Sequence, residues 1–190
     1  MSESPRKTFK YKLEPTQEQE RELERVLLLC RRLYNTALER RKTAHKRSGV
    51  SLSRYGQEAE LKDIRAEMPE YAGVHSQVLQ DVLARLDTAF QAFFRRIRAG
   101  QTPGYPRFHS RGRYNSFTSK EFDNGARLDN GFLVLSKIGR LAVRWSRPLE
   151  GTAKTVTISR EADGYCVCFS CADVPTCRRN PCRSPGGRRA

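Results

Sequence analysis

The 190-residue sequence contains no apolar run that approaches the length of about 18 residues needed to span a bilayer, and its first residues carry no signal-peptide core. We therefore expect a cytoplasmic protein without membrane contact. Acidic residues are also scarce, because 21 Asp and Glu stand against 36 Lys and Arg, a net charge of +15. This excess predicts a polyanionic partner, since each phosphate neutralised by a cation releases counterions.

Recognisable catalytic motifs are absent as well. The sequence has no Walker A, H-E-x-x-H or G-x-S-x-G pattern, and its three histidines stand apart from any Ser, Cys or carboxylate partner that spacing can identify. Of the six cysteines, only Cys168 and Cys171 have the C-x₂-C spacing of a zinc knuckle, and a zinc site needs two such pairs. We predict no catalytic residue, no metal ligand and no cofactor in this chain.

The hydrophobic pattern changes its period at Gly100. Before it, residues 6–13 alternate as a strand, a capping-box pair (Thr16 and Gln19) opens a helical stripe to about residue 46, and further helical stripes cover 53–68 and 78–97. After it, the period falls to two, and short strands are predicted at 132–136, 141–145, 154–159 and 165–170. We expect the helices to pack as a short antiparallel bundle and the first strand to join the later ones in one sheet.

The predicted fold class is therefore α+β, a small β-barrel interrupted by a helical insertion. Its divisions are the first barrel strand (1–14), the helical insertion (15–99), the rest of the barrel (100–172) and a disordered basic tail (173–190). The tail has no periodicity and consists largely of Pro, Gly, Arg and Cys.

Basic and aromatic residues alternate in the segment 100–119, GQTPGYPRFHSRGRYNSFTS, which contains no acid. Cations that hold phosphates beside rings that stack on bases predict a nucleic-acid surface, although such rings could equally anchor an ordinary loop to the core. Phosphate contacts are assigned to Lys10, Lys12, Arg107 and Arg111. Glutamines near the start of the helix at 78–97 can read bases, or they can belong to a solvated helix face.

Six segments resemble, in order and spacing, the N-terminal half of the TnpB (OrfB) proteins that bacterial insertion sequences encode. They are YKLEPTQEQ (11–19), CRRLYNTAL (30–38), SRYGQ (53–57), HSQVLQDVLARLDTAFQAFFRR (75–96), GYPRFHSR (104–111) and LSKIGRLAVRW (135–145). The resemblance implies a wedge-type barrel interrupted by a helical recognition insertion with a helix-turn-helix. It also implies a role in transposition, since full-length members of the family act as RNA-guided DNA endonucleases.

The resemblance also implies partners and contact residues. In the family this half binds guide RNA and helps to read a short motif beside the target, so the expected partners are guide-type RNA and double-stranded DNA at the nucleoid. Matched motif by motif, the expected contacts to target-adjacent DNA are Tyr55, Gln77, Gln80 and Asn124.

One departure from the family concerns the nuclease. In TnpB proteins the strand that resembles YCVCFSCADV leads into a RuvC-like domain with a metal-dependent active site, and no G-[IV]-D-[LV]-G strand follows here. We therefore expect a truncated or frameshifted copy that binds nucleic acid without cutting it. The alternatives are one half of a split or frameshift-restored endonuclease with a separately encoded nuclease half, and an inactive product of a decayed gene.

Overall fold

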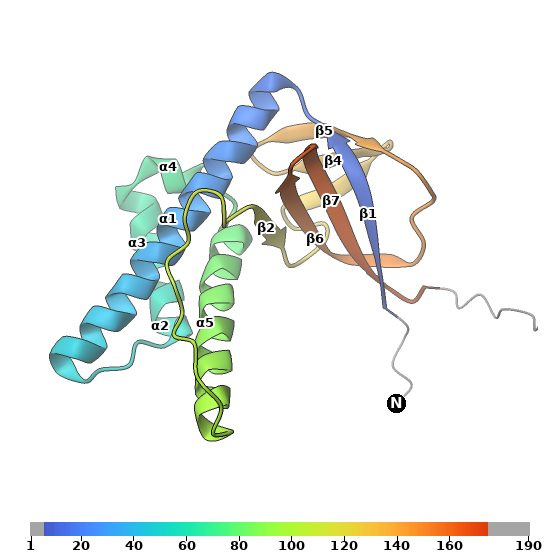
Figure 1. Ribbon diagram of the computed structural model, residues 1–190. Coiled ribbons are helices and arrows are strands. Elements are labelled where there is room, and N and C mark those ends of the chain that lie inside the picture. The colour runs from blue at the N-terminus through green and yellow to red at the C-terminus, as the bar shows by residue number, and fades with distance from the viewer. Residues whose placement is uncertain (1–5, 175–190) are drawn as a thin grey trace, which may run out of the picture.

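The computed structural model describes residues 6–174, and Figure 1 shows a group of helices beside a curled sheet. The chain order is β1 (Lys7–Glu14), α1 (Gln17–Ser48), α2 (Arg54–Ala59), α3 (Leu61–Glu67), α4 (Pro69–Ala72), α5 (Ser76–Arg98), β2 (Ser116–Ser119), β3 (Ala126–Asp129), β4 (Phe132–Leu135), β5 (Gly139–Arg144), β6 (Thr152–Glu161) and β7 (Gly164–Ala172). All the described helices fall between the first two strands. The α+β class with a helical insertion is therefore confirmed.

The sheet is antiparallel, curls into a half-barrel and has the strand order β2-β6-β7-β1-β5-β4-β3. The first strand thus lies at its centre, between β7 and β5, as expected. Its alternation directs Phe9, Tyr11 and Leu13 into the core and leaves Lys10 and Lys12 on the outer face. The ring of Tyr11 packs against that of Trp145 at 4.7 Å between centroids, so a strand from the N-terminus completes a core built mostly by the last third of the chain.

Two edge strands were not predicted from the sequence. The strands β2 and β3 have four residues each, SFTS and ARLD, and neither has enough apolar alternation to be recognised. They form because neighbouring strands supply hydrogen-bond partners: β2 pairs with the ten-residue strand β6, and β3 pairs with β4 across a tight turn.

Helix α1 begins and ends where the sequence predicts. The Thr16 side chain accepts a hydrogen bond from the backbone N–H of Gln19, whose own side chain accepts one from the backbone N–H of Thr16. Gly49 ends the helix in the left-handed region, with φ of +66°. The Gln19 amide also donates to the carbonyl oxygen of Arg140 at 2.7 Å, which holds the start of α1 against β5.

The expected antiparallel packing of the long helices is wrong, because α1 and α5 run in the same general direction (Figure 1). Val26 and Val78 line one small cavity near the starts of both helices, whereas Arg41 pairs with Asp87 further along both. The reason is that the segment expected as one helix at 53–68 divides into α2 and α3 and, with α4, returns the chain to the start of α1. The predicted disordered tail lies outside the described residues except for Asp173 and Val174, and the latter is buried.

Candidate nucleic-acid interface

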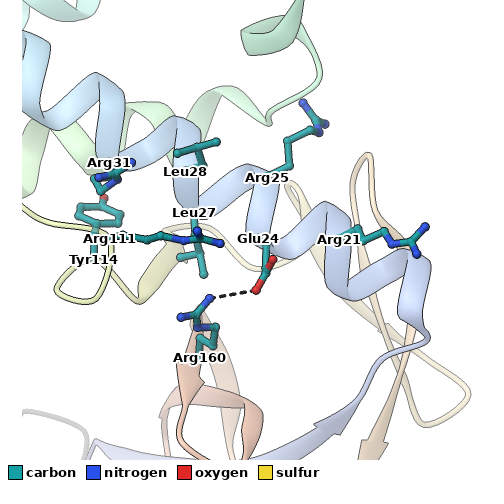
Figure 2. Close-up of a pocket in the computed structure, with 9 residues that line it drawn as sticks. All are labelled: Arg21, Glu24, Arg25, Leu27, Leu28, Arg31, Arg111, Tyr114 and Arg160. Atoms are coloured by element: carbon teal, nitrogen blue, oxygen red, sulfur yellow. Dashed lines mark hydrogen bonds and ion pairs between the residues drawn. The ribbon is translucent and has the colours of Figure 1, made fainter.

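A positively charged cavity lies where α1, the segment 99–115 and β6 meet (Figure 2). Its volume is about 450 Å³, and we call it the basic cleft. The residues that line it are Arg21, Glu24, Arg25, Leu27, Leu28, Arg31, Arg111, Tyr114 and Arg160. Five arginines and one carboxylate therefore line an open cavity, a charge balance that favours a polyanion.

Three separate elements supply the arginines of the basic cleft. Arg21, Arg25 and Arg31 lie on α1 outside its buried apolar stripe, and Arg160 lies near the end of β6. The Arg160 guanidinium donates to the Glu24 carboxylate at 3.0 Å, which joins the sheet to the helix across the cleft. The backbone N–H of Arg160 also donates to the carbonyl oxygen of Asn115 at 2.7 Å, so the same residue holds the end of the segment 99–115.

The segment that carries Arg111 is attached to α1 by side chains from the middle of that helix. The Asn35 amide exchanges two hydrogen bonds with the backbone of His109. The His109 ring lies 4.5 Å from the Tyr34 ring and 5.6 Å from the Tyr114 ring, between centroids. These contacts hold the non-helical segment 99–115 in a defined position, and Arg111 thereby lies in the wall of the cleft.

Charge pairing differs among the arginines of the cleft. Arg160 pairs with Glu24, and Arg25 pairs with Glu22 at 2.8 Å. Within residues 6–174, Arg21, Arg31 and Arg111 have no ion-pair partner. These three guanidinium groups are available to phosphate oxygens, which they can bind through two parallel hydrogen bonds each.

Tyr114 forms the inner wall of the basic cleft. It is 7% exposed, and its hydroxyl has no hydrogen-bond partner among the described residues. Burial raises the pKa of this hydroxyl well above its usual range, so it stays protonated and can donate to an acceptor. Because the hydroxyl oxygen is almost fully buried, Tyr114 contributes its ring rather than its hydroxyl to the surface of the cleft.

The predicted phosphate contacts Lys10 and Lys12 lie on the outer face of β1, in a neighbouring hollow of about 580 Å³. Both are paired with acids at or just after the end of β6: Lys10 with Glu161 at 2.6 Å, and Lys12 with Asp163 at 3.3 Å. The hydrogen bond with Lys10 lowers the pKa of Glu161, and the same bond raises the pKa of Lys10. A phosphate therefore has to compete with these carboxylates. The fourth predicted contact, Arg107, is exposed in the segment 99–115, four positions before Arg111.

The four predicted DNA-contact residues do not all have free side chains. Gln77 is only 9% exposed, and its amide donates to the Glu121 carboxylate at 2.5 Å. Asn124 donates to the same carboxylate oxygen at 3.0 Å, so the structure brings these two residues together.

The other two predicted contacts are accessible. Gln80 is exposed on α5, one turn beyond Gln77, and Tyr55 is 74% exposed on α2. Gln57 holds α2 in place, because its amide donates to the carbonyl oxygen of Ala37 and accepts from Arg41.

Sequence reasoning identified Arg111 but missed Arg21, Arg31 and Arg160. The α1 arginines had a detectable signal, because they recur on the side of the helix left free by its apolar stripe. Arg160 had none, since its position depends on how the sheet packs against α1. Within residues 6–174, no group of three or more His, Cys, Asp and Glu side chains is arranged to hold a metal ion, and no helix is both long and apolar enough to cross a bilayer.

Comparison with known proteins supports a nucleic-acid interface. The helix-turn-helix domain of the OrfB proteins of IS605 elements matches residues 1–49, whose described part forms β1 and α1. The chain is 34% identical over 190 residues to a Streptomyces pristinaespiralis protein named as an RNA-guided DNA endonuclease, across 93% of this chain. It is 34% identical over 165 residues, or 84% of this chain, to the Escherichia coli K12 protein InsQ, which carries the same description.

The chain belongs to the TnpB/OrfB family. It spans 44% and 39% of the length of these two relatives and matches their N-terminal part. The resemblance seen in the sequence is thereby confirmed, and the basic cleft lies within the TnpB/OrfB-like region. The helix-turn-helix match and the transposon-encoded relatives identify a nucleic-acid-binding portion of a transposon-associated protein.

Proposed function

We propose that this TnpB/OrfB chain binds guide-type RNA in the basic cleft and tests duplex DNA beside the guide's target with residues of α2 and α5. The observation that carries the proposal is that Arg21, Arg31 and Arg111, which have no acidic partners within residues 6–174, line one cavity. The names of the two relatives support RNA and DNA as the ligands. For this chain, the proposed role is binding rather than strand cleavage.

RNA binding in the cleft would depend on phosphate contacts. Guanidinium groups on two sides of the cavity can hold successive phosphates, while the Tyr114 ring forms its inner wall. Ion pairing of Arg160 with Glu24 keeps the two walls at a set separation, so the site is formed before RNA enters. Lys10, Lys12 and Arg107 would extend the phosphate track beyond the cleft.

DNA reading would depend on the exposed members of the predicted set. A glutamine amide such as that of Gln80 can pair with both the N6 and N7 atoms of adenine in a major groove. The exposed ring of Tyr55 can contact a base or sugar beside it. In this proposal Gln77 and Asn124 act together through Glu121, and they present its carboxylate and their remaining donors to the DNA.

A salt titration of RNA binding tests the proposal. The full chain is titrated with RNA from the end of its own element and with scrambled RNA of equal length, at several salt concentrations around about 150 mM. We expect tighter binding of the native RNA. Arg31→Ala with Arg111→Ala should lower the magnitude of the salt slope by about 1.5, because two phosphate contacts disappear.

The matched control removes two exposed arginines outside the cleft, Arg47→Ala with Arg127→Ala. It should leave the salt slope close to that of the unmodified chain. Equal slopes for the two double variants would contradict binding in the basic cleft, and equal affinity for the native and scrambled RNA would contradict guide recognition. Loss of discrimination among duplex sequences in Gln80→Ala or Tyr55→Ala would support DNA reading.

A further inference from the structure

A second candidate surface lies at the end of α5, where the segment 99–115 turns back along the helices (Figure 1). We call it the aromatic patch. Its members are Phe93, Phe94, Ile97, Tyr105 and Phe108. The Phe93 ring lies 5.2 Å from the rings of Phe94 and Tyr105, between centroids, and the Lys42 ammonium group lies over the rings of both Tyr105 and Phe108.

The side chains of the aromatic patch are exposed to solvent, although large hydrophobic side chains are usually buried. Phe94, Phe108 and Tyr105 are 51%, 46% and 41% exposed, and Ile97 is also exposed. Four of the nine exposed large hydrophobic residues in the described chain therefore belong to this one surface. Isolated exposed apolar residues are ordinary, but a contiguous group indicates a binding surface.

The charge around the aromatic patch determines what can bind there. Between Asp87 and Glu121 the sequence contains no acidic residue and seven cations, which are Arg95, Arg96, Arg98, Arg107, Arg111, Arg113 and Lys120. Those next to the patch, Arg95, Arg96, Arg98 and Arg107, are exposed and have no ion pair within residues 6–174. From α1, Lys42 adds an ammonium group 4.4 Å from the centroid of the Phe108 ring.

We propose that the aromatic patch binds single-stranded nucleic acid, with unpaired bases stacked on Phe94, Tyr105 and Phe108 and phosphates held by the adjacent arginines. Bases inside a duplex are already stacked on one another, so only unpaired bases can reach protruding rings. Ring faces accept any base, and the surrounding cations neutralise the backbone. The proposal rests on the proposed function only in taking nucleic acid as the partner.

The aromatic patch is separate from the basic cleft, although one segment of the chain links them. The cleft uses Arg111 and Tyr114, beside β6, whereas the patch uses the earlier residues of the segment and the end of α5. A strand held by phosphates in the cleft could continue along the segment and place its unpaired bases on the patch. The two surfaces therefore predict different responses to mutation.

The test measures binding of the full chain to three labelled probes at about 150 mM salt: oligouridine and oligothymidine of about 12 nucleotides, and a duplex of equal length. We expect Phe94→Ala and Phe108→Ala each to weaken binding of both single strands about tenfold and to leave duplex binding unchanged. Tyr105→Phe should bind like the unmodified chain, whereas Tyr105→Ala should not. A 2-aminopurine base in the single strand should report the stacking by its fluorescence.

The matched control is Phe132→Ala, which removes an exposed phenylalanine that also has an arginine at its ring, on β4. It should change none of the affinities. Single-strand affinity that is unchanged in the ring variants, or reduced equally with duplex affinity, would overturn the proposal. So would binding to anionic vesicles without binding to oligouridine. Thermal melting confirms that each variant is folded, and Phe94→Tyr, which keeps the ring, must retain binding.

The same measurements separate the two proposals. If Arg31→Ala with Arg111→Ala weakens RNA binding while the ring variants do not, the basic cleft stands and the aromatic patch fails. If the ring variants lose single-strand binding while the cleft variant binds native RNA with an unchanged salt slope, the patch stands and the cleft fails.

Discussion

Asn35 and His109, 74 positions apart, are joined by two hydrogen bonds: the Asn35 amide nitrogen donates to the His109 carbonyl oxygen at 3.0 Å, and its amide oxygen accepts from the His109 N–H at 2.9 Å. A side chain of α1 thus takes the place of a partner strand for a segment that has no secondary structure at this point. In the sequence His109 lies between Phe108 of the aromatic patch and Arg111 of the basic cleft, so the pair holds the part of the chain that links the two surfaces.

Asn35→Ala should therefore destabilise the protein and loosen the segment 99–115. Losing two partly buried hydrogen bonds should lower the free energy of unfolding by about 2 kcal/mol. Urea denaturation measures that loss, and faster amide exchange at 107–113 would localise it. Thr36→Ala, at the adjacent exposed position of α1, is the control and should change neither. Unchanged exchange in Asn35→Ala would show that the pair does not position the segment.

Gln77 and Gln80 should respond differently to substitution by alanine, although both are predicted DNA contacts. The buried amide of Gln77 donates to the Glu121 carboxylate and accepts from its backbone N–H, so Gln77→Ala should cost about 1–3 kcal/mol of unfolding free energy. Gln80 is exposed, so Gln80→Ala should leave stability within about 0.5 kcal/mol and change only DNA discrimination. Equal melting temperatures for the two variants would contradict the structural role of Gln77.

Gly125 should tolerate alanine less well than Gly139. Both have positive φ, +102° and +104°. A Cβ added at Gly125 would lie 2.7 Å from Nδ1 of His75, whereas a Cβ added at Gly139 would have no atom within 4 Å. Gly139→Ala should cost about 1–2 kcal/mol from backbone strain, and Gly125→Ala about 1–3 kcal/mol more from the clash. In a His75→Ala background, the excess cost at Gly125 should disappear. Additive free energies in that double-mutant cycle would refute the clash.

Stability should fall as the solution becomes mildly acidic, because two histidines resist protonation in the folded chain. Burial lowers the pKa of His75, with a further contribution from Arg65, and burial lowers that of His109, assisted by Arg113. Above the unfolded value of about 6.5 both states are neutral and stability is complete. As pH falls below it, the unfolded chain takes up protons first, so stability is lost until the lowered folded pKa is passed. Melting temperatures between pH 7.5 and 5.5 should show this loss, and His75→Gln with His109→Gln should reduce the slope.

Removing the acids beside Lys10 and Lys12 should strengthen nucleic-acid binding. Glu161→Gln with Asp163→Asn frees both ammonium groups, so affinity should rise, together with the magnitude of the salt slope. The control, Glu150→Gln with Asp129→Asn, removes the same formal charge next to Lys7 and Arg140. An equal gain in both variants would mean that net charge alone acts and that Lys10 and Lys12 are not specific contacts.

Much of the fold followed from local rules that can be read in the sequence. The Thr16 and Gln19 pair predicted the start of α1, and alternation at Phe9 and Tyr11 predicted the strand that became the centre of the sheet. These features depend on neighbours a few positions away. The relative direction of α1 and α5 was not predictable in this way, because it depends on the path of the short helices between them.

The candidate site was also predictable only in part from the sequence. Net charge and the acid-free segment 100–119 predicted a nucleic-acid surface that included Arg111, because composition and spacing are local properties. The partners of Arg111 in the cleft, Arg31 and Arg160, could be found only in three dimensions. They lie 80 and 49 positions away, and a cavity forms only once the sheet, the helix and the segment pack together. Tertiary packing likewise decided which predicted contacts stay accessible, because burial and hydrogen bonding engage Gln77 and leave its neighbour Gln80 exposed.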